Sequence, residues 1–213
     1  MKITVIGAGK MGRGLAMRFA MAGHDTTIAS FSLELAEEAA EFARQKTGCA
    51  NIAGGLNADA VAAAELVVMV IPVTSRREVL ESLRDVLQGK ILVDVTIPMA
   101  FDPVRYAPPA EGSNALETQA ILGDGCRVAS GFHTVSFTLL QKTERPLTGS
   151  TLIVGSDPDC RRAVMELAES IGLRPVDAGG LEHSPTVESL TPMLLGINKR
   201  YGTGGAGIDI TGI

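Results

Sequence analysis

The chain has 213 residues, enough to bury roughly 70% of the surface that its unfolded form exposes. Apolar residues make up 46% and charged residues 20% of the sequence, which excludes a disordered, collagen-like or coiled-coil chain. The net charge is −5 and there is no basic block, so the composition excludes a general nucleic-acid binder, which needs a surface that neutralises phosphates.

The three cysteines, Cys49, Cys126 and Cys160, lie far apart and show neither a CxxC pair nor the spacing of metal ligands. An odd number of scattered thiols is typical of a reducing compartment. The N-terminus enters a predicted strand directly, so we expect no secretory signal. Because no apolar run reaches the roughly 20 residues that span a bilayer, we expect a cytoplasmic protein without a membrane partner.

The first half of the chain alternates predicted strands and helices with short links. Strands are predicted from β-branched and apolar runs, and helices from apolar residues at helical spacing or from Ala- and Glu-rich composition. In chain order these are a strand at Met1–Ile6, a helix at Arg13–Ala22, a strand at Thr26–Ser30, a helix at Leu33–Lys46 capped by Ser32, a short helix at Ala58–Ala64, a strand at Leu66–Ile71, a helix opened by the capping box Ser75–Glu78, and a strand at Lys90–Ile97. Right-handed crossovers turn this alternation into an α/β doubly wound parallel sheet, the Rossmann arrangement.

The second half starts with a predicted loop, Pro98–Ser113, which contains four prolines and a glycine. A helix at Ser113–Leu122 and a strand at Arg127–Phe132 complete a dinucleotide-binding domain, predicted as residues 1–135. Residues 136–213 are predicted to form a small C-terminal α/β lobe. Its elements are a strand at Thr151–Gly155, a helix at Asp159–Ile171, a strand at Arg174–Ala178, a returning apolar helix at Glu188–Tyr201 and a glycine-rich tail.

Gly7, Gly9 and Gly12 form a GxGxxG motif that follows the first strand and opens a helix. This is the context in which the motif binds a dinucleotide; the structural alternative is a simple strand-to-helix turn. Gly7 suits a tight turn, Gly9 lets the backbone approach a pyrophosphate, and Gly12 lets the helix pack on the strand. Free amides at the helix start then face the phosphates. The predicted coenzyme site also includes Lys10, Met11, Ile71 and Pro72.

Residues 30–32 follow the second strand, where an NAD enzyme usually carries an Asp or Glu that binds the ribose 2′-hydroxyl. Here the residues are Ser30, Phe31 and Ser32, without a carboxylate. A 2′-phosphate meets no like charge there, the two hydroxyls can donate to it, and Phe31 can stack on adenine. The pattern favours NADP and leaves NAD open. Candidate cations for the 2′-phosphate are Lys10, Arg13, Arg76 and Arg77; the alternative for the last two is a solvated helix face.

His133 follows the predicted strand Arg127–Phe132 directly. Ligands of open α/β sheets bind outside the carboxyl ends of the strands, so we predict that His133 contacts the substrate. The alternative is a hydrogen-bonded structural histidine. His24 follows a helix C-cap glycine and is predicted to be structural. Asp94, inside an apolar strand, is predicted to be a buried carboxylate with its hydrogen bonds satisfied.

The chain resembles the deazaflavin-dependent NADP reductases, which transfer hydride between NADP and coenzyme F420. Besides the glycine motif, the resemblance rests on the blocks Phe132–Thr134, Leu173–Gly179 and Val187–Pro192. It implies an N-terminal dinucleotide domain, a small C-terminal lobe with F420 bound between the two, and a homodimer. It also implies a pocket for the second substrate beside the nicotinamide. The residues that the resemblance places around the paired rings are His133, Val135, Thr191, Ala206 and Gly207.

Three functions remain open when the residues and the resemblance are taken together. Hydride transfer between NADP and F420 needs two rings stacked at about 3–3.5 Å, and His133 would then position and polarise the deazaflavin. Reduction of another small carbonyl or imine substrate by NAD(P)H needs a general acid, and His133 would be that acid. The third function is a non-enzymatic, dinucleotide-binding redox sensor. We favour the first.

Overall fold

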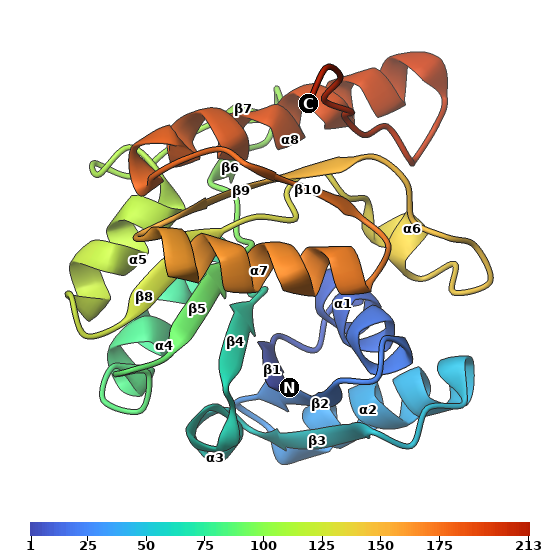
Figure 1. Ribbon diagram of the computed structural model, residues 1–213, viewed down its shortest axis with the longest axis vertical. Coiled ribbons are helices and arrows are strands. Elements are labelled where there is room, and N and C mark those ends of the chain that lie inside the picture. The colour runs from blue at the N-terminus through green and yellow to red at the C-terminus, as the bar shows by residue number, and fades with distance from the viewer.

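The structure, a computed structural model that describes residues 1–213, is built around one sheet of eight strands (Figure 1). The spatial order is β10-β9-β8-β5-β4-β1-β2-β3, and all neighbours are parallel except β8 and β9. The strands are β1 (Lys2–Ile6), β2 (Asp25–Ser30), β3 (Ile52–Leu56), β4 (Leu66–Met69), β5 (Ile91–Asp94), β8 (Arg127–Ser130), β9 (Ser150–Gly155) and β10 (Arg174–Asp177). The order reverses between β1 and β4, which confirms the predicted doubly wound fold and marks the edge where ligands bind.

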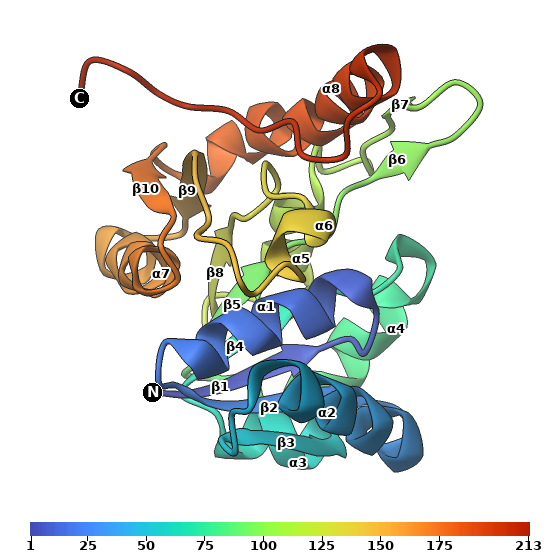
Figure 2. The same cartoon turned by 90° about the vertical axis from the view of Figure 1, so that its right-hand side faces the viewer.

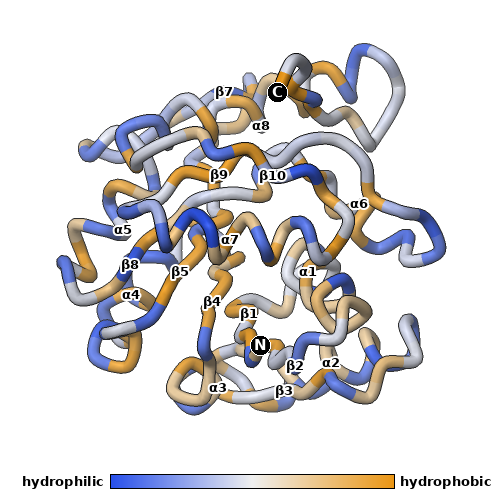
Figure 3. The backbone as a smooth tube through the Cα atoms, viewed as in Figure 1, coloured by the Kyte–Doolittle hydropathy of each residue, from blue (hydrophilic) through white to orange (hydrophobic).

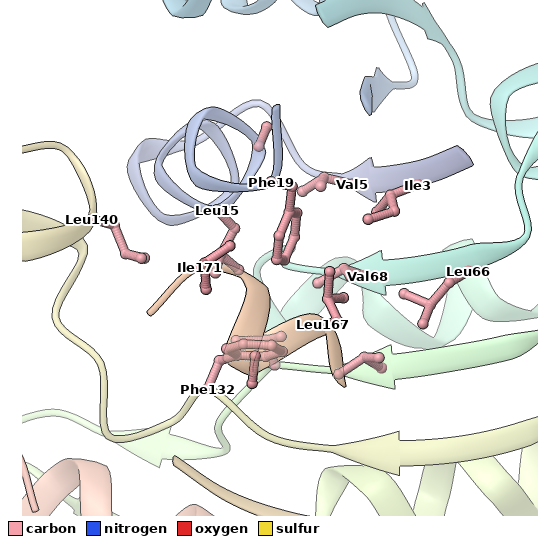
Figure 4. Packing of buried hydrophobic residues seen from close by; sticks show 14 of the residues in the cluster. Ile3, Val5, Leu15, Phe19, Leu66, Val68, Phe132, Leu140, Leu167 and Ile171 are labelled. Atoms are coloured by element: carbon pink, nitrogen blue, oxygen red, sulfur yellow. The ribbon is translucent and has the colours of Figure 1, made fainter. Parts of the chain in front are cut away.

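Helices cover both faces of the sheet, and each face has its own cluster of buried apolar side chains. One face carries α1 (Lys10–Met21), α2 (Leu33–Thr47) and α7 (Pro158–Ser170); the other carries α3 (Asn57–Ala63), α4 (Val73–Leu83) and α5 (Asn114–Leu122). On the first face Phe19 of α1 meets Phe132 edge-on, with the ring centroids 6.1 Å apart, close to Leu167 of α7 (Figure 4). Hydrophobic residues concentrate in central strands such as β4 (Figure 3), because helices cover such strands on both sides.

The remaining elements lie beyond the carboxyl ends of the central strands. They are the hairpin β6 (Met99–Ala100) and β7 (Arg105–Tyr106), the short helix α6 (Phe137–Leu140), a 3-10 turn η1 (Leu181–His183) and the long helix α8 (Ser184–Tyr201). Helix α8 lies beside the hairpin, and the tail runs back past β9 and β10 (Figure 2). The Ser150 amide donates to the Ile208 carbonyl at 2.8 Å, which fastens this tail to the sheet. None of the helices is both long and apolar enough to cross a membrane.

The structure adds one detail to the predicted organisation and corrects two others. β9 pairs antiparallel with β8, so the sheet continues across the predicted boundary after residue 135, and the division into two domains stays a prediction. The prediction of a helix-opening capping box at Ser75–Glu78 is wrong, because α4 begins at Val73 directly after Pro72. The segment predicted as a loop, Pro98–Ser113, contains the hairpin of β6 and β7.

Candidate active site

The glycine motif packs against the backbone so closely that side chains are excluded at two of its positions. Gly7 has a φ of +127°, and a Cβ there would lie 2.2 Å from the Val70 carbonyl oxygen. A Cβ on Gly12 would lie 1.9 Å from the Gly7 carbonyl oxygen. At Gly9, which precedes α1, a Cβ would meet nothing within 4 Å. The loop is therefore compact inside and open at Gly9, where the free amides of α1 can receive a pyrophosphate.

The three residues after β2 differ in what they present to a ligand. Ser30 is buried, and its hydroxyl oxygen accepts from the Ser32 amide at 3.4 Å. The Ser32 hydroxyl oxygen accepts from the Leu35 amide at 3.4 Å, so Ser32 caps α2 as predicted and keeps its own hydrogen free to donate. Phe31 is 84% exposed, which leaves its ring face available for stacking.

Arg76 is not available to a phosphate, and the predictions of a phosphate ligand or a solvated helix face are both wrong for it. Its side chain is buried and donates to Asp94 at 3.2 Å, to Thr118 at 2.9 Å, to Glu117 and to the Asn114 carbonyl. Periodicity alone cannot show this, because the acceptors come from β5 and from α5, far along the chain. Asp94 also accepts from Thr118, and from the Thr96 amide and hydroxyl, so the prediction of a satisfied buried carboxylate is confirmed.

The other three candidate cations have different surroundings. Arg77 pairs with Glu117 of α5 and with Glu81 of its own helix, α4. The Lys10 ammonium lies 5.6 Å from the ring centroid of Phe137. The Arg13 guanidinium lies 4.6 Å from the ring centroid of Phe42 on α2, the helix that Ser32 caps. Of the four cations, Arg13 is therefore the one that packs against the helix following residues 30–32.

A cavity of about 910 Å³ lies beyond the carboxyl ends of β4, β5 and β8 and next to α8. Its lining is mostly apolar. It includes seven of the predicted site residues, namely Met11, Ile71, Pro72, His133, Val135, Thr191 and Ala206. The remaining predicted residues, Gly7, Gly9, Lys10, Gly12, Ser30, Phe31, Ser32 and Gly207, are not part of this lining.

Sequence reasoning missed several of the residues that line the cavity. The hairpin contributes Met99 and Phe101, and α6 contributes Phe137. No local pattern marks these three, because the chain brings them to the cavity through tertiary packing. The α8 contribution does have a signal: Thr191, Leu194, Leu195 and Asn198 share one helix face at positions i, i+3, i+4 and i+7.

His133 is buried against this cavity in a loop that is held from several sides. Its carbonyl accepts from the Thr191 hydroxyl of α8 at 2.8 Å. On the sheet side, the Thr134 hydroxyl donates to the Ser150 carbonyl at 2.9 Å, and the Phe132 amide donates to the Thr151 hydroxyl at 3.0 Å. Phe132 itself has a φ of +64°, a conformation that costs a bulky residue energy and that the surrounding bonds maintain.

The His133 ring has two nitrogens, and neither has a hydrogen-bond partner within the protein. Burial lowers the pKa of His133 to about 4, and the Asp94 carboxylate opposes this only in part. The imidazole is therefore neutral at neutral pH, with one nitrogen able to donate and the other able to accept. Unpaired buried polar atoms cost about 1–3 kcal/mol, a cost that a hydrogen bond to a ligand or a water molecule would offset. His24, in contrast, lies 3.0 Å from the Ser170 hydroxyl, as expected for a structural histidine.

These features define an α/β dinucleotide-binding fold with an apolar cavity beside the glycine motif. Comparison with known proteins specifies the family. The family described as NADP oxidoreductase, coenzyme F420-dependent, matches residues 2–98. The F420-dependent NADP reductase of Methanothermobacter thermautotrophicus is 37% identical over 100% of this chain and 96% of that protein. The F420-dependent NADP reductase of Methanocaldococcus jannaschii is 34% identical over 100% of this chain and 99% of that protein. The chain belongs to the family of F420-dependent NADP reductases.

A solved structure extends the similarity to the whole fold. The crystal structure of a candidate F420-dependent NADP reductase from Arthrobacter sp. FB24 superimposes with a TM-score of 0.86. It is 26% identical, and the match covers 100% of both chains. The overall fold is therefore shared by the two proteins.

Proposed function

We propose that this protein is an oxidoreductase that transfers a hydride between NADP(H) and coenzyme F420. The observation that carries the proposal is His133: this residue, with a buried, neutral imidazole whose two nitrogens are unpaired, lines a large apolar cavity beside the dinucleotide motif. An apolar cavity with one such polar group suits a flat heterocycle whose carbonyl and N–H groups lie in the ring plane. Family membership supports the same pair of substrates.

Different residues serve the two ligands in this proposal. The amides behind Gly9 bind the pyrophosphate, and residues 30–32 bind the adenosine end with its 2′-phosphate. Ile71 and Pro72 place the nicotinamide at the mouth of the cavity. The residues that border the second ring system are His133, Val135, Thr191, Ala206 and Gly207.

When bound, the two coenzymes supply the hydride donor and the hydride acceptor. The protein binds both rings, holds them in the geometry of transfer and excludes water. His133 orients the second ring by donating one hydrogen bond and accepting another. Its lowered pKa keeps it uncharged, so it polarises the ring without donating a proton of its own.

The same observation weakens the alternative of a general carbonyl or imine reductase. A general acid works best with a pKa near the operating pH, whereas burial keeps the pKa of His133 at about 4. A non-enzymatic redox sensor does not require a cavity of this size next to the dinucleotide motif. Both alternatives predict NADPH binding without consumption of F420.

Mixing the purified protein with NADPH and oxidised F420, and following the absorbance of both, tests the proposal. Rapid loss of both absorbances is expected. NADPH binding without loss of F420 absorbance, or NADPH oxidation that occurs only with an added carbonyl or imine compound, would contradict it.

We also propose a homodimer and a cytoplasmic location. The first is supported by large apolar side chains left exposed on α8, such as Met193 at 49%. The second is supported by three free cysteines, two of them buried. Light scattering on the purified protein and fractionation of cells test these two proposals separately.

A further inference from the structure

The hairpin of β6 and β7 forms one wall of the cavity through Met99 and Phe101. Its base is closed by the Ala107 amide, which donates to the Pro98 carbonyl at 2.9 Å. Figure 2 shows the hairpin beside α8 and away from the strands of the main sheet. Because the hairpin has only two short strands, its position relative to the cavity depends on side-chain bonds to its neighbours.

Tyr106 of β7 provides those bonds. Its hydroxyl lies 3.0 Å from the Gly112 carbonyl oxygen and 3.1 Å from Oε2 of Glu188 on α8. A phenol has a single hydrogen, and both neighbours are acceptors when Glu188 is ionised. Both bonds can form at full strength only if the Glu188 carboxyl carries a proton: Glu188 then donates to Tyr106, and Tyr106 donates to Gly112.

The surroundings of Glu188 favour the protonated form. The side chain is fully buried and forms no ion pair. Burial raises the pKa of Glu188 to about 7, against the opposing effect of amide donors from Asn114 and Ala115, both at 3.0 Å. The titratable groups that act on it are Asp94 of β5, whose charge raises the pKa further, and Tyr106 of β7, whose hydrogen bond lowers it. The nearby cation on α4, Arg76, pairs with Asp94 and Glu117 instead.

We propose that Glu188 carries a proton, which it shares with Tyr106 by donating a hydrogen bond to the phenol oxygen, and that this latch, Glu188–Tyr106–Gly112, positions the hairpin wall of the cavity and thereby sets the affinity for the second substrate. Neither Glu188 nor Tyr106 lines the cavity, so both are positioning residues. Ionisation of Glu188 leaves the single Tyr106 hydrogen to two competing acceptors, so one of the two bonds of the latch is lost. The claim about affinity rests on the proposed function; the claim about the shared proton does not.

A spectroscopic experiment tests the shared proton without any substrate. The chain has two tyrosines and no tryptophan, and Tyr201 is 80% exposed at the end of α8. In the Tyr201→Phe variant, tyrosine absorbance and fluorescence report on Tyr106 alone. Between about pH 5 and about pH 9 we expect a spectral transition centred near pH 7, well below the ionisation of the phenol itself.

Two further variants assign that transition. It should vanish when Glu188→Gln is added to the Tyr201→Phe background. It should also be missing from Tyr106→Phe, which retains only the exposed tyrosine and covers the case in which the Glu188 variant does not fold. A tyrosine signal in Tyr201→Phe that does not change with pH would contradict the proposed shared proton. A transition that remains after Glu188→Gln or Tyr106→Phe would contradict it as well.

Kinetics tests the positioning role. Tyr106→Phe removes one hydroxyl and keeps the ring, and Tyr201→Phe is the matched control. We expect the KM for F420 to rise about fivefold in Tyr106→Phe, the loss that one hydrogen bond implies, with the KM for NADP unchanged. Equal changes in both KM values, or a lower kcat at unchanged KM, would contradict positioning of the hairpin. Lack of F420 turnover in the unmodified protein would instead refute the proposed function, and the spectroscopic result would still stand.

Discussion

The Thr191 hydroxyl donates a hydrogen bond to the main-chain carbonyl of His133, 2.8 Å away, and so ties the middle of α8 to the loop beyond β8. One turn earlier on the same helix, Glu188 caps the start of α5 and contacts Tyr106 of the hairpin. A single segment of α8 therefore holds two walls of the cavity. This gives a physical reason for the block Val187–Pro192 on which the family resemblance partly rests.

Replacing the imidazole should separate substrate positioning from coenzyme binding. In His133→Ala we expect unchanged affinity for NADP, because His133 lines the cavity and the glycines of the motif do not. Hydride transfer should slow by about 10- to 100-fold, the typical result of a misplaced reactant. Stopped-flow absorbance and NADPH titration measure the two effects, with His24→Ala as a control outside the cavity. Unchanged transfer accompanied only by lower thermal stability would mean that His133 is structural.

His133 should also affect stability as a function of pH. Its pKa is lowered in the folded protein to about 4 from 6.5, so the unfolded chain binds more protons between these values. Its contribution is fully present above about pH 6.5 and is lost as the pH falls toward about 4. Glu188 acts in the opposite direction, since a raised pKa makes its contribution fall as the pH rises from 4.5 to about 7.

Comparing the unmodified protein with His133→Gln isolates the effect of the histidine on the free energy of unfolding. As the pH falls from about 6.5 to about 4, we expect the unmodified protein to lose stability relative to His133→Gln. Urea unfolding of both proteins at several pH values measures this difference in stability. A difference that stays constant with pH would show that the imidazole titrates normally.

The two neighbouring arginines of α4 should differ strongly in their effect on stability. Arg76→Ala leaves Asp94 and Glu117 as buried charges without their main partner, which should cost about 3–5 kcal/mol of unfolding free energy. Arg77, with its side chain 56% exposed, also pairs with Glu117, yet Arg77→Ala should cost no more than about 1 kcal/mol. Denaturant unfolding compares them directly. Similar losses for both would contradict the buried network.

Coenzyme preference should depend on the residues after β2. A 2′-phosphate meets no carboxylate there, and the Ser32 hydroxyl retains a hydrogen to donate. A charge-assisted bond is worth about 1.5–3 kcal/mol, so we expect preference for NADP by about tenfold or more. Ser30→Asp should reverse it, because a carboxylate repels the phosphate and accepts from free ribose hydroxyls. Values of kcat/KM for both coenzymes, in the unmodified enzyme and in the variant, test this expectation. A preference of the unmodified enzyme for NADH would mean that the 2′-phosphate does not bind at residues 30–32.

Removal of the tail should affect the two substrates unequally. Ala206 lines the cavity, and its amide donates to Asn198 of α8 at 2.8 Å, while the far end of the tail is bound to Ser150 and Arg174. Deleting Thr203–Ile213 should therefore raise the KM for F420 more than the KM for NADP. Steady-state kinetics measures both. Equal increases would assign the tail to the fold or to a dimer contact.

Much of the fold follows from local sequence patterns. Each buried parallel strand is a short apolar run, and the spacing of the glycine motif follows from backbone contacts that exclude any Cβ at Gly7 and Gly12. These signals are local because hydrogen bonding and sterics within a few residues determine them. Strand β3 was missed because Gly54 and Gly55 interrupt it, a composition atypical of strands.

Local sequence patterns do not predict the cavity or the surroundings of its side chains, because both depend on tertiary structure. Arg76 and Arg77 are adjacent in sequence, and only the packing of α5 against α4 buries one and leaves the other half in solvent. The hairpin wall, the pairing of Tyr106 with Glu188 and the unpaired nitrogens of His133 likewise depend on residues brought together from distant parts of the chain. Burial, and with it the protonation state of a buried group, is a property of the assembled neighbours, which the residue's own sequence context does not contain.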